Sequence, residues 1–306
     1  MLASKIDPIQ GGQSQTSLKP LLGYICAGAV ALIWATWLVV TRSGAQSTLT
    51  SFDLAALRYG VSAVFALPLV LYFKPWQSMP IRRIAILTFL LSPIYILFVF
   101  GGFVYAPAAH GGIFMNGVLP AFTLLIGWYW LSEKVSVLQI VGVVAIIVGA
   151  SLAVADASKL SLFDSWIGDL MFIIGAIFFS AYLVVSRLWQ IEILHILMCS
   201  SVINAIIYIP IWYFLLPGGM SGASESQIVL QTLYQGLIPN LLGLLLVAVA
   251  VRHVGPAATA AFMAAVPGLG SILSFIFLGE EPGMLGWLSL AILTPGIVMV
   301  AVIRKP

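Results

Sequence analysis

Long apolar runs alternate along the chain with short segments that contain charged residues, proline or glycine. Each run has about 20 residues, the length that an α-helix needs to cross about 30 Å of bilayer hydrocarbon. We therefore expect an all-α polytopic membrane protein with ten transmembrane helices. The turn at Tyr105-Ala106-Pro107 is so short that the third and fourth runs can also be interpreted as one merged span. The expected spans are 20–42, 51–73, 81–104, 106–131, 135–154, 165–187, 193–215, 227–251, 256–278 and 283–303.

The composition supports a membrane protein. The chain has 306 residues, of which 61% are hydrophobic and only 8% are charged, and its mean hydropathy is +1.12. A soluble domain carries about 25% charged residues, so a water-soluble fold is excluded. The net charge of +3 gives no argument for a nucleic-acid partner. Cys26 and Cys199 lie inside apolar runs without metal-ligand spacing, so we expect no disulfide, metal or cofactor.

The basic residues predict the orientation of the chain, because lysine and arginine collect in cytoplasmic loops. A cytoplasmic N-terminus leaves only Arg42 and Lys159 on the outer side. We therefore expect both termini in the cytoplasm, with residues 1–19 as a polar tail. The basic residues expected inside are Lys5, Lys19, Lys74, Arg82, Arg83, Lys134, Arg187, Arg252, Arg304 and Lys305.

An internal repeat divides the chain into two halves, which we place at residues 20–155 and 156–306. The segment that ends at Arg42 aligns with the one that ends at Arg187, and the spacing from Pro120 to Glu133 equals that from Pro267 to Glu280. Five spans in each half insert the halves in opposite orientations, as in many alternating-access transporters. We expect the two glutamates to cap or bridge the loops at the repeat ends.

Four prolines lie near the centres of their spans, at repeat-related positions, and are the expected hinges. Proline lacks the N–H that would bond the carbonyl four residues earlier, and a free carbonyl in hydrocarbon is costly unless it faces a cavity. The pairing favours a central cavity between broken helices, although simple kinks also fit. The prolines are Pro93, Pro120, Pro239 and Pro267, and the carbonyls belong to Phe89, Asn116, Gln235 and Met263.

These elements together resemble the drug/metabolite transporter superfamily, and its EamA family in particular. The resemblance rests on Trp34 in the first helix, the sequence Asp53-Leu-Ala-Ala-Leu-Arg58-Tyr59 opening the second, and the repeated proline followed by Leu-x-Glu. It implies a multi-pass carrier of the inner membrane, often an exporter of amino acids, and the branch that exports aromatic amino acids also matches. His110-Gly-Gly departs from the repeat and can mark substrate choice.

Polar residues inside the spans are candidate substrate ligands. Arg58 can hold a substrate carboxylate, snorkel to the interface or pair with Asp53. His110 can bind substrate or carry a proton, and it can equally be a neutral imidazole bonded to the backbone. Asn116, four residues before Pro120, and Asn240, directly after Pro239, can face a ligand. Asn204 is expected to bond between helices.

Aromatic residues and methionines away from the interfaces can line an adaptable cavity or simply pack the core. They are Trp34, Trp37, Tyr95, Met115, Phe179, Tyr182, Phe262 and Met263.

The favoured function is a secondary carrier that exports neutral, especially aromatic, amino acids by alternating access. A multidrug efflux carrier is the alternative, and a carrier of nucleotide sugars or phosphorylated sugars ranks lower because only Arg58 offers charge in the core. No HExxH helix or P-loop supports an enzyme. The expected partners are a small-molecule substrate and the lipid bilayer, and the oligomeric state stays open.

Overall fold

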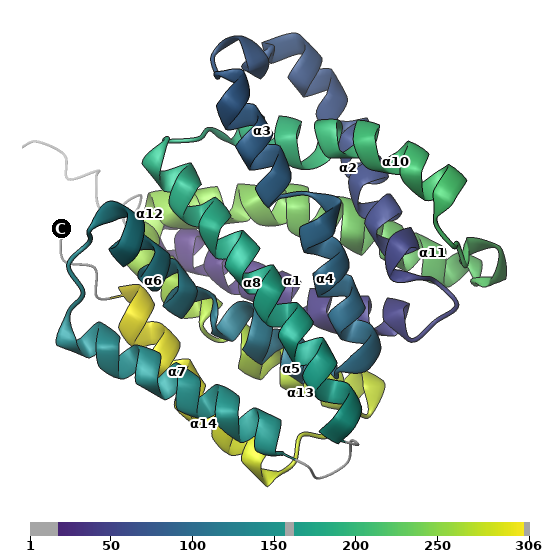
Figure 1. The fold of residues 1–306 in the computed structure, drawn as a ribbon. Helices are drawn as coiled ribbons and strands as arrows, with labels where there is room; N and C mark the ends of the chain where they lie inside the picture. The colour runs from purple at the N-terminus through teal and green to yellow at the C-terminus, as the bar shows by residue number, and fades with distance from the viewer. Residues whose placement is uncertain (1–17, 157–161, 303–306) are drawn as a thin grey trace, which may run out of the picture.

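The computed structural model describes residues 18–156 and 162–302. Every regular element in these two ranges is a helix (Figure 1). Most of the expected cytoplasmic tail lies outside the described residues, as do Lys5, Lys159, Arg304 and Lys305. The expectation of an all-α chain is confirmed for the part that the structure describes.

The first half contains spans one to five. Spans one and two are single helices, spans three and four are broken, and span five is again a single helix. In order, the elements are α1 (Leu18–Ala45), α2 (Ser51–Phe73), η1 (Pro75–Gln77), α3 (Ile81–Leu90), α4 (Pro93–Tyr105), α5 (Ala108–Gly111), η2 (Gly112–Gly117), α6 (Leu119–Leu131) and α7 (Val137–Ala155).

The second half contains spans six to ten, again with broken helices in the middle spans. Its elements are α8 (Leu162–Leu188), α9 (Ile193–Leu197), η3 (Met198–Ile203), α10 (Asn204–Leu215), η4 (Met220–Gly222), α11 (Glu225–Gln231), η5 (Thr232–Leu242), α12 (Gly243–Met263), α13 (Val266–Leu278) and α14 (Met284–Val302).

Two tight reversals bring the number of crossings within residues 18–156 and 162–302 to ten. Residues 225–263 form 39 continuous helical residues, about 58 Å at 1.5 Å per residue, which is too long for one crossing of the bilayer. The backbone leaves the helical region at Gly255 (φ 83°, ψ 164°), a conformation that favours glycine, and proline follows. Span nine therefore runs from Pro256 through α13. Extended backbone at Ala106 and Pro107 likewise separates spans three and four, so the merged interpretation of those runs is wrong.

Local sequence explains several helix boundaries. Thr50 and Asp53 form a reciprocal capping box at the start of α2, and Ser136 and Gln139 form another at the start of α7. Gly279 adopts the left-handed conformation that ends α13. These signals place the spans close to the ranges predicted from hydropathy.

The helices of the two halves interlock. In Figure 1, α7 (teal) lies alongside α14 (yellow) at one edge, and α8 crosses the bundle next to α4. Helix α1 packs against α12 and α13 of the other half. Large apolar side chains such as Val64, Phe277 and Leu215 stay exposed on the outside. A surface of this kind is covered by lipid, and the chain is a multi-pass membrane protein.

Close backbone packing holds α7 against α14. A Cβ on Gly142 would lie 2.8 Å from the carbonyl oxygen of Gly296, and a Cβ on Gly296 would lie 2.8 Å from that of Gly142. Small residues at such contacts let membrane helices approach closely.

We expect Gly142→Val to separate the helices and lower the melting temperature in detergent, at a cost of about 2 kcal/mol. Gly268→Ala, where a Cβ would meet no atom within 4 Å, is the matched control. Equal melting of both variants would contradict this packing role.

Three of the four expected hinge prolines interrupt their helices, and not all of the carbonyls are free. Pro93, Pro120 and Pro267 begin new helical segments, and Pro239 lies inside the π-helix η5. The carbonyl of Phe89 accepts a hydrogen bond from Ser92 N at 3.1 Å. The Gln235 carbonyl accepts one from Asn240 Nδ2 at 2.9 Å. The expectation of unpaired carbonyls was therefore wrong at these two positions.

Candidate functional site

A central cavity of about 140 Å³ opens between the two halves. All three π-helical segments, η2, η3 and η5, contribute to its wall, and such wide turns often occur at functional sites. The first half supplies Trp34, Trp37, Arg58, Tyr59, Ser62, Leu91, Tyr95, Met115 and Asn116. The second half supplies Phe179, Tyr182, Ile196, Leu197, Ser200, Ser201, Pro239, Asn240 and Leu244.

Nine of the twelve residues expected to bind substrate line this cavity, together with the expected hinge Pro239. The nine are Trp34, Trp37, Arg58, Tyr95, Met115, Asn116, Phe179, Tyr182 and Asn240. Phe262 instead packs near Gly28 and Tyr24, and Met263 packs against the main hydrophobic core. His110 lies at a second cavity, described below.

Sequence reasoning missed several wall residues. Ser200 and Ser201 enter the cavity because η3 turns them inward, and Ser62 and Tyr59 flank Arg58 on α2. The adjacent serines inside an apolar run were a usable signal. No signal in the sequence marked Leu91 and Leu244 as cavity residues, because one leucine among many in a membrane helix is not distinctive.

Stacked aromatic rings form one side of the central cavity. Tyr95 stacks on Phe179 with ring centroids 5.9 Å apart and an interplanar angle of 21°, and Phe179 lies 5.3 Å from Tyr182. The hydroxyl of Tyr59 donates to the Leu91 carbonyl at the α3–α4 break. A flat apolar group on a ligand would find complementary surface here.

Buried amides connect the cavity wall to α1. Trp37 Nε1 donates to Gln235 Oε1 at 2.9 Å, and Gln235 Nε2 donates to Thr41 Oγ1 and Gln231 Oε1. Gln231 Nε2 donates in turn to the Val40 carbonyl. Both glutamines are fully buried. This ladder fixes the orientation of the Trp37 indole in the cavity.

Arg58 is the charged group of the central cavity. Among the described residues its guanidinium has no hydrogen-bond or ion-pair partner. Asp53, the expected alternative partner, is fully buried and already engaged. Its carboxylate accepts from Trp212 Nε1 at 3.0 Å and from Gly219 N at 2.7 Å. Pairing between Arg58 and Asp53 is therefore not what the structure shows.

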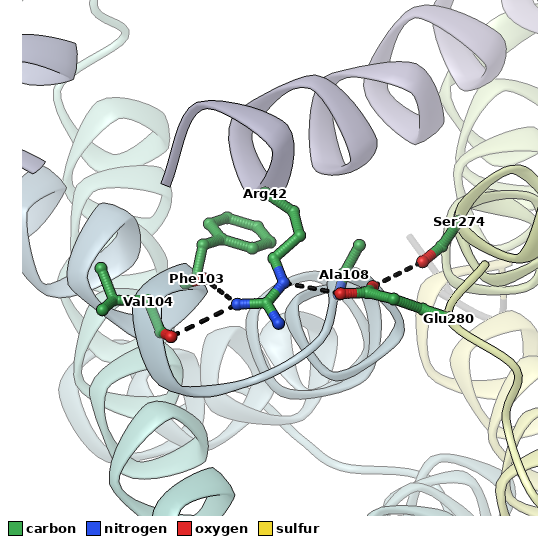
Figure 2. Close-up of polar contacts among 6 residues, drawn as sticks. All are labelled: Arg42, Phe103, Val104, Ala108, Ser274 and Glu280. Atoms are coloured by element: carbon green, nitrogen blue, oxygen red, sulfur yellow. Dashed lines mark hydrogen bonds and ion pairs between the residues drawn. The ribbon is translucent and has the colours of Figure 1, made fainter. Parts of the chain in front are cut away.

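An ion pair joins the halves at one end of the bundle, and Figure 2 shows its partners. Arg42 Nε, at the end of α1, lies 2.6 Å from Glu280 Oε1, just after α13. Arg42 Nη1 also donates to the carbonyls of Phe103 and Val104. The second carboxylate oxygen of Glu280 accepts from Ala108 N at 2.9 Å and from Ser274 Oγ at 2.7 Å. The side chains of the pair are only 11% and 14% exposed.

The repeat-related pair lies at the ends of α8 and α6. Arg187 Nη2 approaches Glu133 Oε1 at 2.8 Å. This nitrogen does not reach hydrogen-bond geometry, and the two side chains are 33% and 34% exposed. Gly127 occupies the position equivalent to Ser274, so no hydroxyl supports Glu133 there. Both glutamates thus bind arginine across the halves, and a loop-capping role describes them incompletely.

His110 belongs to a side cavity of about 250 Å³ next to the Arg42 ion pair. Its Nδ1 lies 2.7 Å from Asp169 Oδ1 on α8, and Asp169 is buried. The partner of the imidazole is therefore a carboxylate, where the sequence had suggested a backbone group. Among the described residues, no group of three or more His, Cys, Asp or Glu gathers that could hold a metal ion.

A family model for EamA-like transporters matches the chain twice, at residues 21–155 and 166–302. The chain belongs to the EamA-like transporter family. It is therefore a membrane transporter, and the two matches correspond to the two repeats. The sequence resemblance to this family is confirmed.

One curated relative of this EamA-like chain is a probable terminal-alkyne amino-acid exporter from Streptantibioticus cattleyicolor. It is 24% identical over 203 residues, which cover 65% of this chain and 66% of that protein, slightly less than two thirds. A solved crystal structure superposes with a TM-score of 0.61 at 16% identity and covers 92% of this chain and 96% of its own. At that identity the likeness shows a shared fold.

The amides of this EamA-like transporter separate into cavity and scaffold groups. Asn204 Nδ2 donates to the carbonyls of Thr88, Leu91 and Cys199, so it bonds between helices as predicted. The Asn116 amide lines the central cavity, without a hydrogen bond to another described residue.

We expect Asn116→Ala to reduce transport several-fold at unchanged melting temperature. Asn204→Ala should mainly lower stability, by about 2 kcal/mol. Flux per folded protein checks both, and equal flux in the two variants would contradict the division.

Proposed function

We propose that this transporter exports small amphiphilic metabolites, above all neutral and aromatic amino acids, across the cytoplasmic membrane by alternating access. The observation that carries the proposal is the pair of repeat-related ion pairs, Arg42–Glu280 and Arg187–Glu133. Each joins one half to the other. The chain crosses the bilayer five times between the end of α1 and the end of α8, so the two pairs should lie on opposite faces. The central cavity lies between them.

In this mechanism each ion pair is a gate. Opening one face separates α1 from α13 and breaks Arg42–Glu280, whereas opening the other separates α8 from α6 and breaks Arg187–Glu133. The helix breaks at Pro93, Pro120 and Pro267, and the wide π-helical turn around Pro239, let the two segments of a span move independently. Because the halves are inverted, the same motion that closes one face opens the other.

The distribution of basic residues supports an orientation with the Arg42 pair outside and the Arg187 pair inside. Cysteines at Gln46 and Gln190, exposed residues that follow α1 and α8, test this assignment. An impermeant thiol reagent added to intact cells should label Gln46→Cys and spare Gln190→Cys. Labelling of both from the same side would reject the inverted topology.

The shape and lining of the central cavity support the choice of cargo. Its aromatic wall suits an apolar side chain, and its few polar groups suit a single small head group. The relative from Streptantibioticus cattleyicolor is a probable exporter of a terminal-alkyne amino acid, which supports the same class of cargo. Multidrug efflux is the second candidate, because the same aromatic wall would accept other amphiphiles. A nucleotide sugar fits less well, since only Arg58 offers charge for a phosphate.

Reconstitution in liposomes tests the proposal. Vesicles loaded with labelled phenylalanine, tyrosine, leucine or valine should release label faster than protein-free vesicles. Unlabelled amino acid on the opposite side should accelerate the release by exchange. Failure to move any of these amino acids would reject the cargo class. Resistance to amphiphilic drugs in an efflux-deficient host would then favour the second candidate.

A further inference from the structure

The side chains that line the central cavity complement a negative charge on a ligand, but not a positive one. Arg58 contributes a guanidinium, and no Asp or Glu lines the cavity in the part of the chain that the structure describes. The nearest acid along the same helix, Asp53, is bound by Trp212, Gly219 and Thr50. The positive charge of Arg58 is therefore not neutralised by a carboxylate contact with a described residue.

The remaining polar groups of the cavity are uncharged. Asn240 Nδ2 donates to the Gln235 carbonyl at 2.9 Å and to Ser62 Oγ at 3.4 Å. This arrangement leaves Asn240 Oδ1 as an acceptor, and the Asn116 amide offers both a donor and an acceptor. A ligand ammonium group would meet only uncharged side chains, namely amides, hydroxyls such as those of Ser200 and Ser201, and the faces of aromatic rings. Such partners bind a cation more weakly than a carboxylate does.

Physical chemistry ranks the possible head groups. A guanidinium binds a carboxylate through two parallel hydrogen bonds, and this charge-assisted contact is strong where water is scarce. A monocarboxylate neutralises the site, whereas a zwitterion leaves one uncompensated positive charge. An amide offers Arg58 only one neutral carbonyl acceptor, and an amine places a second positive charge against it.

We infer that Arg58 anchors a carboxylate of the cargo, and that this carboxylate is the group the carrier requires while an α-amino group is dispensable. The inference rests on the proposed function and names its substrate class as small apolar monocarboxylates, with amino acids as one subset. The 2-oxo acid that matches a transported amino acid should therefore bind at least as well as the amino acid. The corresponding amide and amine should be rejected.

Four compounds that share one aromatic ring test the inference. They are phenylalanine, phenylpyruvate, phenylalanine amide and phenethylamine. We would measure how each raises the melting temperature of the purified protein and how each inhibits flux of labelled phenylalanine. Phenylpyruvate should act at the same concentration as phenylalanine or below it. The amide and the amine should need at least about tenfold more, which corresponds to about 1.4 kcal/mol.

Variants assign the preference to Arg58. Arg58→Gln should remove the preference for acid over amide and reduce acid binding at least about tenfold. Arg58→Lys, which keeps the charge, should retain part of the preference for acid over amide. It is the control that distinguishes loss of the charge from misfolding of Arg58→Gln. Arg82→Gln, at an exposed arginine outside the cavity, should bind all four compounds like the parent.

The outcomes separate this inference from the proposed function. Phenylalanine flux with equal binding of acid and amide would overturn the inference and keep the amino-acid cargo. No amino-acid flux, together with stabilisation by phenylpyruvate that depends on Arg58, would support the inference and reject amino acids as cargo. Absence of both flux and stabilisation would overturn both.

Discussion

Glu280→Gln is expected to reduce amino-acid flux at least about tenfold and to open the outer end of the transporter. The carboxylate of Glu280 binds Arg42, the first turn of α5 and Ser274 at the same time. Removing its charge leaves the Arg42 guanidinium buried without an anion. Breaking a buried pair in this way costs about 3 kcal/mol. This cost destabilises the conformation in which the outer face is closed. Conformations that are open at this face therefore gain population, and the transport cycle stalls.

A reporter cysteine in the side cavity would measure the opening. Ile113 lines that cavity and is almost fully buried. In a background without Cys26 and Cys199, Ile113→Cys should react with an outside thiol reagent much faster when Glu280→Gln is present. Glu225→Gln removes an exposed outer carboxylate and should change neither labelling nor flux. The exchange Arg42→Glu with Glu280→Arg should restore part of the closure. Unchanged labelling in Glu280→Gln would contradict the gate assignment.

Removing one hydroxyl at the outer pair, or adding one at the equivalent position of the inner pair, should each shift the conformational balance by roughly tenfold. Ser274 Oγ donates to Glu280 at 2.7 Å in the outer pair, whereas Gly127 is the equivalent residue beside Glu133 in the inner pair. A hydrogen bond to a charged group contributes about 1.5 kcal/mol, or roughly tenfold in an equilibrium constant. Ser274→Gly should therefore weaken the outer gate. Gly127→Ser should strengthen the inner one.

The geometry allows this exchange. A Cβ on Gly127 would lie 2.7 Å from Glu133 Oε2, which is the flexible end of a side chain and can shift. Combined, the two substitutions should raise outside labelling of Ile113→Cys and lower labelling of a cavity reporter, Ser200→Cys, from the inside. Gly127→Ala fills the same space without a donor and is the control for the hydroxyl. An identical shift in the alanine and serine variants would show that crowding, not hydrogen bonding, sets the balance.

The two gates differ although the repeat gives them the same charged residues. The Arg42–Glu280 pair is buried and makes four further hydrogen bonds, two donated by Arg42 and two accepted by Glu280. The inner pair is about one-third exposed, and Arg187 Nη2 makes no hydrogen bond. Water screens an exposed pair and weakens it. The structure therefore favours closure at the Arg42–Glu280 end. In the proposed orientation, cargo would then enter from the cytoplasmic side.

The spans, the inverted repeat and most of the cavity wall could be predicted from the sequence. A membrane helix needs a run of apolar residues of fixed length, and a repeat is visible as a fixed spacing of Arg, Pro and Glu landmarks. The breaks at Pro93, Pro120 and Pro267 were visible as well, because proline cannot donate a hydrogen bond within a helix. Pro68, Pro210 and Pro295, however, lie inside continuous helices, so it was the repeat-related spacing that marked the breaks. All of these signals are local along the chain.

Which side chains meet was decided only by the tertiary structure. Arg42 and Glu280 are 238 residues apart, and His110 and Asp169 are 59 residues apart, on helices whose packing no local pattern specifies. The hydrogen bonds that Gln231 and Gln235 make to α1, and the partners that Asp53 binds, could likewise not be predicted from the sequence. The lack of a partner for Arg58 depends on every neighbouring helix at once. Charge compensation in a membrane bundle is set by packing between distant segments, so the sequence named the charged groups and the fold determined their partners.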